Sequence, residues 1–215
     1  VAVTKAMASA VRINEVLDTQ STLTDEGTNA QKDKADTARV EFRNVTFTYD
    51  GSQVPALTGI SFTAKPGETI GIIGGTGCGK STLVNLIPRF YDVTQGEILI
   101  DGNSVKAYPF AQLRTKIGMV PQHAVLFKGT IRDNMKWGKA DATDQQIDLA
   151  LSIAQAKDFV DSKPEKLDTM ISQGGANLSG GQRQRLTIAR ALVGKPEILV
   201  MDDSASALDF ATGAA

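Results

Sequence analysis

One short stretch constrains the fold of this chain more than any other. Residues 74–82 read GGTGCGKST and match G-x-x-x-x-G-K-[ST], a loop that wraps the phosphates of a nucleotide. Such a loop joins a strand to a helix, because the positive end of the helix dipole and its free N–H groups favour an anion. ETIGIIG at 68–74 predicts a buried strand, and STLVNLIPRF at 81–90 has apolar residues at helical spacing. The sequence therefore predicts an α/β fold that binds a nucleoside triphosphate.

The residue types of this loop have distinct physical roles. Gly74, Gly77 and Gly79 are expected to take backbone angles that a Cβ would disfavour, so that the loop can curl around a phosphate chain. Lys80 should reach the β- and γ-phosphates, and the Ser81 hydroxyl should bind Mg²⁺. The nucleotide-binding residues predicted here are Gly74, Gly75, Thr76, Gly77, Cys78, Gly79, Lys80, Ser81 and Thr82.

A second candidate anion site lies further along the chain. LSGGQRQRLTIARAL at 178–192 predicts a helix whose start offers the Ser179 hydroxyl and the N–H groups of Gly180 and Gly181. An apolar run that ends in two carboxylates, ILVMDD, follows at 198–203. In their order, these three motifs resemble the ATP-binding cassette (ABC) family, and within it the nucleotide-binding domain of an exporter.

The resemblance extends over most of residues 40–209 and implies an architecture. It implies a P-loop NTPase core, with a mixed sheet and an antiparallel β subdomain, plus a mostly helical signature subdomain at about 123–177. It also implies ATP and Mg²⁺ sandwiched between two domains arranged head to tail. The signature residues of one copy, Ser179, Gly180, Gly181 and Gln182, would then bind the nucleotide of the other copy. The implied partners are this second nucleotide-binding domain and the transmembrane domains of the same transporter, at the cytoplasmic face of the cell membrane.

Further single residues take roles from the same resemblance. Tyr49, which ends the strand-like VEFRNVTFTYD, resembles the aromatic that stacks on adenine, and Val54 lies behind it. Gln122 resembles the Q-loop glutamine that touches Mg²⁺ and the attacking water, and Asp202 resembles the Walker B aspartate that holds Mg²⁺. SALD at 206–209 resembles the D-loop that crosses to the partner. The predicted metal ligands are Ser81, Gln122 and Asp202, and the predicted catalytic residues are Lys80, Gln122 and Asp203.

The chain departs from the family pattern in three places. Asp203 stands where the family normally has a catalytic Glu, which favours a degenerate half of a heterodimeric exporter; the alternative is a homodimeric ATPase in which Asp203 works or was engineered. His123 is the only histidine and follows Gln122, so it cannot be the family's switch histidine. Because the given chain ends at Ala215, we expect that the last strand and this histidine are missing from it, and that hydrolysis by this fragment alone is weak or absent. Gln173 stands where exporters often carry Glu.

Composition and the N-terminal region complete the prediction. The chain has 215 residues with 23 basic and 24 acidic side chains, so bulk charge does not indicate nucleic acid. A single cysteine excludes an internal disulfide and is typical of a reducing compartment. Residues 1–18 predict a helix at the end of a transmembrane segment, 19–38 a polar flexible linker, and 39–215 the nucleotide-binding domain. No apolar run is long enough to cross a bilayer.

Other classes of function fit the motifs less well. A soluble ABC ATPase of DNA repair would carry a long coiled coil between the phosphate loop and the signature, and no sustained heptads occur there. An importer domain would usually begin near its first strand as a separate chain, whereas a helix and a linker precede residue 40 here. A third alternative is a regulatory domain that binds ATP with little hydrolysis, and Asp203 keeps this alternative in place.

Overall fold

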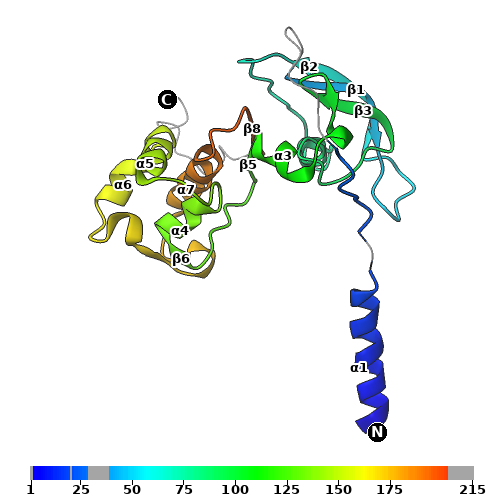
Figure 1. Cartoon of the computed structure of the whole chain (residues 1–215), viewed down its shortest axis with the longest axis horizontal. Helices are drawn as coiled ribbons and strands as arrows, with labels where there is room; N and C mark the ends of the chain where they lie inside the picture. Colours follow the sequence, from blue (N-terminus) through cyan, green and yellow to red (C-terminus); the bar gives the residue numbers. More distant parts are fainter. Residues whose placement is uncertain (1, 20, 29–38, 203–215) are drawn as a thin grey trace.

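The computed structural model describes residues 2–19, 21–28 and 39–202 (Figure 1). Along the chain, a β-rich part precedes a helical part. The two strands of a small parallel sheet, β5 and β8, come before and after the helical part. The helices are α1 (Ala2–Leu17), α2 (Lys80–Leu86), α3 (Phe110–Thr115), α4 (Ile131–Lys136), α5 (Asp144–Ile153), α6 (Lys157–Asp161) and α7 (Gly180–Leu192). The strands are β1 (Val40–Phe47), β2 (Leu57–Ala64), β3 (Gln95–Ile100), β4 (Asn103–Ser104), β5 (Ile117–Val120), β6 (Gly129–Thr130), β7 (Met170–Ile171) and β8 (Ile198–Met201).

The β-rich part is an antiparallel sheet in the order β2-β1-β3-β4. In the central strand β1, apolar and polar residues alternate, and a bulge with Asn44 in the left-handed region brings both Phe42 and Val45 into the core. Phe42 stacks on Phe62 of β2 with ring centroids 4.5 Å apart. This core also takes in the apolar face of α2, which consists of Leu83, Val84 and Leu86. The sheet therefore supports the helix that follows the phosphate loop.

The parallel pair β5–β8 carries the predicted Gln122 and Asp202 just beyond its carboxyl end. Ile117 lies opposite Ile198, and Val120 lies opposite Met201. Antiparallel and parallel pairing occur in separate sheets, and a cluster of salt bridges connects the two sheets. The Asp101 side chain, only 5% exposed, pairs with Arg39 and with Lys116. Burial lowers the pKa of Lys116, but its hydrogen bonds to Asp101 and Glu197 outweigh burial and leave that pKa raised.

The helical part has its own core, made by α4, α5, α6 and the inner face of α7. Three of its helices begin with a capping box, in which a Ser or Thr hydroxyl and a side chain three residues later satisfy the first N–H groups. The three caps are Thr130, Thr143 and Ser179. A short ladder of β6 and β7 closes this part. With the antiparallel sheet and the parallel pair, these helices confirm the predicted α/β class and its helical signature subdomain.

The strand predicted for residues 68–74 is wrong for this structure. The segment has no ladder partner among the described residues and is exposed, with Ile73 at 98%. A strand needs a neighbour to satisfy its N–H and C=O groups. Here the segment runs beside β8, and a cavity of about 490 Å³ lies between them. Ile70, Leu199 and Met201 line that cavity and are consequently only half covered.

The N-terminal region extends away from the rest of the chain (Figure 1). α1 lies within the segment 1–18, whose place at the end of a transmembrane segment stays a prediction. The apolar side chains along α1, such as Met7, Val11 and Leu17, are exposed. Within the described residues, none of the helices combines the length and apolarity that a bilayer crossing requires. Residues 21–28 form no helix or strand, but they contact the β-rich part near α3.

Candidate nucleotide-binding site

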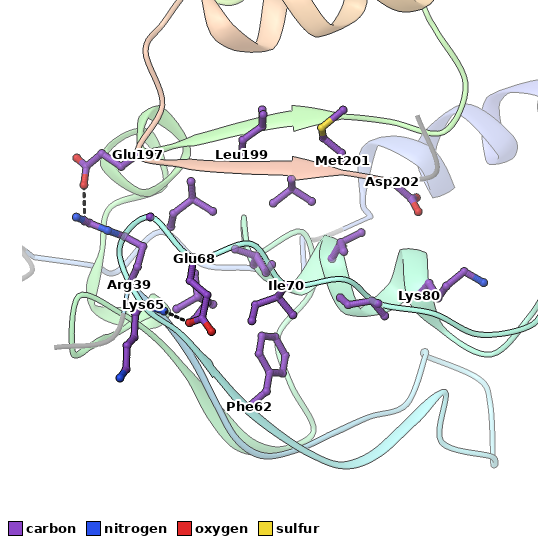
Figure 2. Close-up of a pocket in the computed structure, with 18 of the residues that line it drawn as sticks. Arg39, Phe62, Lys65, Glu68, Ile70, Lys80, Glu197, Leu199, Met201 and Asp202 are labelled. Carbon is purple, nitrogen blue, oxygen red and sulfur yellow. Dashed lines mark hydrogen bonds and ion pairs between the residues drawn. The ribbon is translucent and has the colours of Figure 1, made fainter. Parts of the chain in front are cut away.

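A cavity between β8 and residues 65–76 ends at the phosphate loop. Its lining includes Gly74, Thr76 and Lys80 from the loop and Asp202 from the end of β8. Figure 2 shows Lys80 and Asp202 at one end of this space, and Arg39 with Glu197 at the other end. Apolar side chains such as Ile70 and Leu199 lie between these two ends. The predicted loop lysine and Walker B aspartate are therefore brought together at the same end of one cavity.

The loop glycines adopt the backbone shapes that a phosphate cradle requires. Gly77 and Gly79 have φ of 82° and 93°, which L side chains rarely adopt. A Cβ on Gly79 would also lie 2.9 Å from the carbonyl oxygen of Ala56. Gly74 differs, since its need is for space: a Cβ there would lie 2.5 Å from Cys78 Sγ. The prediction of special backbone angles therefore holds for Gly77 and Gly79.

Lys80 is held by the loop itself. Its Nζ donates hydrogen bonds to the carbonyl oxygens of Gly74 and Gly75, at 2.8 Å each. The same ammonium group also lies 3.8 Å from Cys78 Sγ, so three atoms of the loop hold the side chain across it. The positive charge lies beside the N-terminal end of α2, where an anion is favoured. Contact of Lys80 with a phosphate oxygen stays a prediction.

Tyr49 lies beside the start of α2. Its hydroxyl and that of Thr82, the last loop residue, are 3.0 Å apart. Its ring packs edge-on against Phe47 and Tyr91, with centroids 4.7 and 5.3 Å away. One side chain therefore joins the end of β1 to the phosphate loop, while 37% of it remains exposed. Val54 is exposed in the same connection between β1 and β2. Contact of either residue with adenine stays a prediction.

Gln122 and Asp202 follow neighbouring strands. The backbone N–H of Asp202 donates to the carbonyl oxygen of Val120 at 2.9 Å, which extends the β5–β8 pairing by one step. Gln122 lies two residues after Val120 and is exposed, as is the adjacent His123. Because the carboxyl ends of parallel strands meet at one edge, both candidate ligands follow the same edge of the β5–β8 pair, and of the two only Asp202 lines the Lys80 cavity. Asp203 and the predicted D-loop lie outside the described residues.

The donor set at this edge suits Mg²⁺. The Ser81 hydroxyl, the Gln122 amide oxygen and the Asp202 carboxylate are hard oxygen donors, and Mg²⁺ typically takes one or two carboxylates together with phosphate oxygens. Ser81 is exposed in the first turn of α2, and Asp202 is partly exposed in the cavity that Lys80 also lines. These residues fit the ion, and their role as ligands remains a prediction.

The signature residues lie on the helical part. Ser179 caps α7: its Oγ accepts the N–H of Gln182 at 3.2 Å, and Gln182 Oε1 accepts the N–H of Ser179 at 3.0 Å. The Ser179 hydroxyl proton is still available to another acceptor. Gly180 and Gly181 follow in the first turn. Of the described residues that line the Lys80 cavity, none belongs to the signature. The two helix starts predicted to bind anions therefore lie apart in this chain, and anion binding at each stays a prediction.

Some features of the site have no signal in the sequence. The carbonyl oxygen of Ala56 and the side chain of Leu57 lie so close to Gly79 that a Cβ there would be 2.9 Å from each. The start of β2 therefore supports the phosphate loop. The apolar lining from β8 has a weak signal: burial alternates along Ile198–Met201, and Leu199 and Met201 face the less covered side. Only the folded chain shows that these side chains border the nucleotide site.

Comparison with known proteins places the chain in a family. The family model for ABC transporters matches residues 57–206. The chain is 48% identical over 211 residues to an uncharacterised ABC transporter ATP-binding protein of Bacillus subtilis, a match that covers 98% of this chain and 36% of the relative. It is 43% identical over 184 residues to a putative multidrug export ATP-binding/permease protein of Staphylococcus aureus, covering 86% and 32% respectively.

A solved structure gives the same answer for the fold. The chain is similar to a bacterial Atm1-family ABC exporter with ATP bound, with a TM-score of 0.86 and 36% identity, over 98% of this chain and 36% of that one. This chain thus spans little more than a third of the length of the Bacillus relative and of the solved exporter. Its motifs, its fold and these matches agree, and the chain belongs to the ABC transporter family as an ATP-binding domain of the exporter type.

Proposed function

We propose that this chain binds Mg·ATP and hydrolyses it to drive export across a membrane, as a domain at the cytoplasmic face of a larger transporter. The observation that carries the proposal is the meeting of Lys80 and Asp202 at one end of one cavity, beside the Gly77–Gly79 loop. Lys80 and the loop N–H groups would hold the β- and γ-phosphates. Ser81, Gln122 and Asp202 would hold Mg²⁺, which neutralises charge on the phosphate oxygens. Gln122 and Asp203 would orient the attacking water.

The nucleotide site is proposed to be completed by a second domain. One chain carries a phosphate loop and a signature helix that do not share a cavity. A head-to-tail pair would place the α7 start of each copy over the phosphates of the other, where the helix dipole and the Ser179 hydroxyl favour an anion. The relative whose structure is solved had ATP bound. ATP is then both substrate and part of the dimer interface.

A charge at position 179 tests this arrangement. Ser179→Asp keeps a good helix cap, because aspartate is among the preferred N-cap residues, but it sets a carboxylate against the partner's phosphates. Sedimentation at rising ATP, with EDTA to prevent hydrolysis, should show the parent dimerising and the variant dimerising at least about tenfold more weakly. Thr143→Asp is the matched control, since Thr143 caps α5 in the same kind of box. Equal dimerisation of parent and Ser179→Asp would contradict the head-to-tail site.

The membrane-spanning partner is proposed to dock beside Trp137. Trp137 is 69% exposed, and the centroids of its ring and the Phe127 ring are 4.8 Å apart. A hollow of about 340 Å³ adjoins both rings and reaches Arg190. Burial lowers the pKa of Arg190, and its Nη1 has no hydrogen-bond partner among the described residues. An aromatic patch beside an unneutralised cation fits a cytoplasmic loop of a permease region that presents apolar side chains and a carboxylate or free carbonyl groups.

Removing the exposed ring tests the docking proposal. In the full-length transporter, Trp137→Ala should lower transport at least about tenfold, because an aromatic anchor in an interface typically contributes 2 kcal/mol or more. ATP binding by the isolated domain should stay within about twofold, since Trp137 is remote from the Lys80 cavity lining. Ile153→Ala, which truncates an apolar side chain on α5 that is 59% exposed, is the control. Full transport by Trp137→Ala would sink the proposal.

A further inference from the structure

The linker between α1 and the β-rich part makes a defined contact. Asp25 Oδ1 accepts the backbone N–H of Phe110, the first residue of α3, at 2.8 Å. The N-cap position of α3 is Pro109, which offers no side-chain hydrogen bond. A residue from far away in the sequence therefore supplies the cap that α3 lacks locally. The beginning of α3 is held by the linker.

Backbone packing strengthens this contact two residues later. A Cβ on Gly27 would lie 2.2 Å from the carbonyl carbon of Tyr108 and 2.5 Å from the nitrogen of Pro109, so only glycine fits this approach. Tyr108 is itself fixed, since its side chain is buried and its hydroxyl donates to the carbonyl oxygen of Ile100 at 2.8 Å. The linker thus rests on a rigid surface.

The same contact borders the end of the phosphate-loop helix. Arg114 of α3 donates to the carbonyl oxygens of Pro88 and Arg89, just beyond α2, at 3.3 Å each. The guanidinium groups of Arg89 and Arg114 lie over the Phe110 ring, 4.9 and 4.5 Å from its centroid. The hydrogen bond to Asp92 raises the pKa of Arg89, and the charges of Asp25 and Glu26 add to that shift. The linker, α2 and α3 therefore meet at Phe110.

Two of these elements continue into the nucleotide site. α2 begins at Lys80, and α3 runs through Lys116 into β5, which ends at Val120 just before Gln122. We infer that Asp25 is a positioning residue for nucleotide binding: by capping α3 it sets the placement of β5 and so of Gln122. The inference rests on the proposed Mg·ATP function and adds a link from residues 25–27 to the metal side of that site.

The test separates the metal-dependent part of ATP affinity from the rest. ATP binding is measured by titration calorimetry with Mg²⁺ and again with EDTA, on the whole chain and on Asp25→Ala. The gain in affinity that Mg²⁺ gives should fall about fivefold in Asp25→Ala, within the usual range of coupling between distant sites. The affinity in EDTA should stay within about twofold, because the phosphate loop and Lys80 are unchanged. Asp25→Asn retains an acceptor oxygen, so its gain in ATP affinity from Mg²⁺ should lie between that of the parent and that of Asp25→Ala.

Control measurements make the possible outcomes distinct. Glu15→Ala removes a carboxylate from α1 and should leave both affinities unchanged. An unaltered Mg²⁺ gain in Asp25→Ala, or an equal loss with and without Mg²⁺, would overturn the positioning role, the second result indicating only a loosened fold. If Asp25→Ala does not fold, the same comparison made with Asp25→Asn decides. Absence of ATP binding by the parent would refute the proposed function, and this inference would fall with it.

Discussion

Lys80→Ala is expected to weaken Mg·ATP binding about a hundredfold. The Lys80 ammonium group donates hydrogen bonds to two carbonyl oxygens of the phosphate loop and places a positive charge there. Hydrogen bonds to charged groups contribute about 1.5–3 kcal/mol each, and a loss near 3 kcal/mol corresponds to about two decades in Kd. The fold should survive, because the carbonyls released from Lys80 lie in an exposed loop and can bind water. Calorimetric titration measures the change.

Lys65→Ala provides the matched control for charge. Lys65 lines the same cavity at the end away from the phosphate loop, and Figure 2 shows its side chain pointing out of the space. Lys65→Ala removes the same charge and a similar side-chain volume as Lys80→Ala. The Kd of this variant for Mg·ATP should therefore change less than about threefold at physiological salt. Similar losses in the two variants would mean that net charge, and not the loop geometry, attracts the nucleotide.

Asp203→Glu is expected to raise ATP turnover by up to about a hundredfold. Asp203 follows Asp202, the predicted Walker B aspartate, and the Asp203 side chain is one carbon–carbon bond, about 1.5 Å, shorter than the glutamate of the family pattern. A misplacement of about 1 Å in a group that orients a reactant can reduce the rate about a hundredfold. Phosphate release under single-turnover conditions, with the domain in excess over Mg·ATP, isolates this step from product release.

The neighbouring carboxylate is the control for this gain. Asp202→Glu makes the same chemical change one residue earlier, where the side chain is predicted to hold Mg²⁺, so turnover should fall. Equal rates for the parent and Asp203→Glu would remove the basis for a degenerate site. Fast Mg²⁺-dependent turnover by a homodimer of the parent would do the same and favour the homodimeric ATPase.

Local sequence patterns predict much of this molecule. The helix after the phosphate loop, the helix that begins after Ser179 and the strand that leads to Asp202 depend on residues close together in the sequence, and each is found where it was expected. The alternation in residues 40–47 likewise predicts β1, because one face of the strand must enter the core. Such features need no knowledge of distant parts of the chain.

What the patterns cannot give is pairing across long separations. The run at 68–74 has a strand's composition, yet a strand forms only when a neighbour takes up its backbone groups, and the structure places a cavity there. The polar composition of residues 19–38 predicts a flexible linker, and it gives no sign that Asp25 accepts the backbone N–H of Phe110. No periodicity links these two residues, and only the fold brings them into contact.

The space beside β8 has a consequence for handling the isolated domain. β8 is paired with β5 along one edge, and its other edge borders apolar side chains and open volume. A strand with unsatisfied backbone groups on one side is a template for any extended segment that reaches it. The uncovered Gly71–Ile73 stretch of a neighbouring molecule has the composition to do so. Dilute solution, or a peptide strand that fills the gap, would guard against intermolecular β-sheet growth and precipitation.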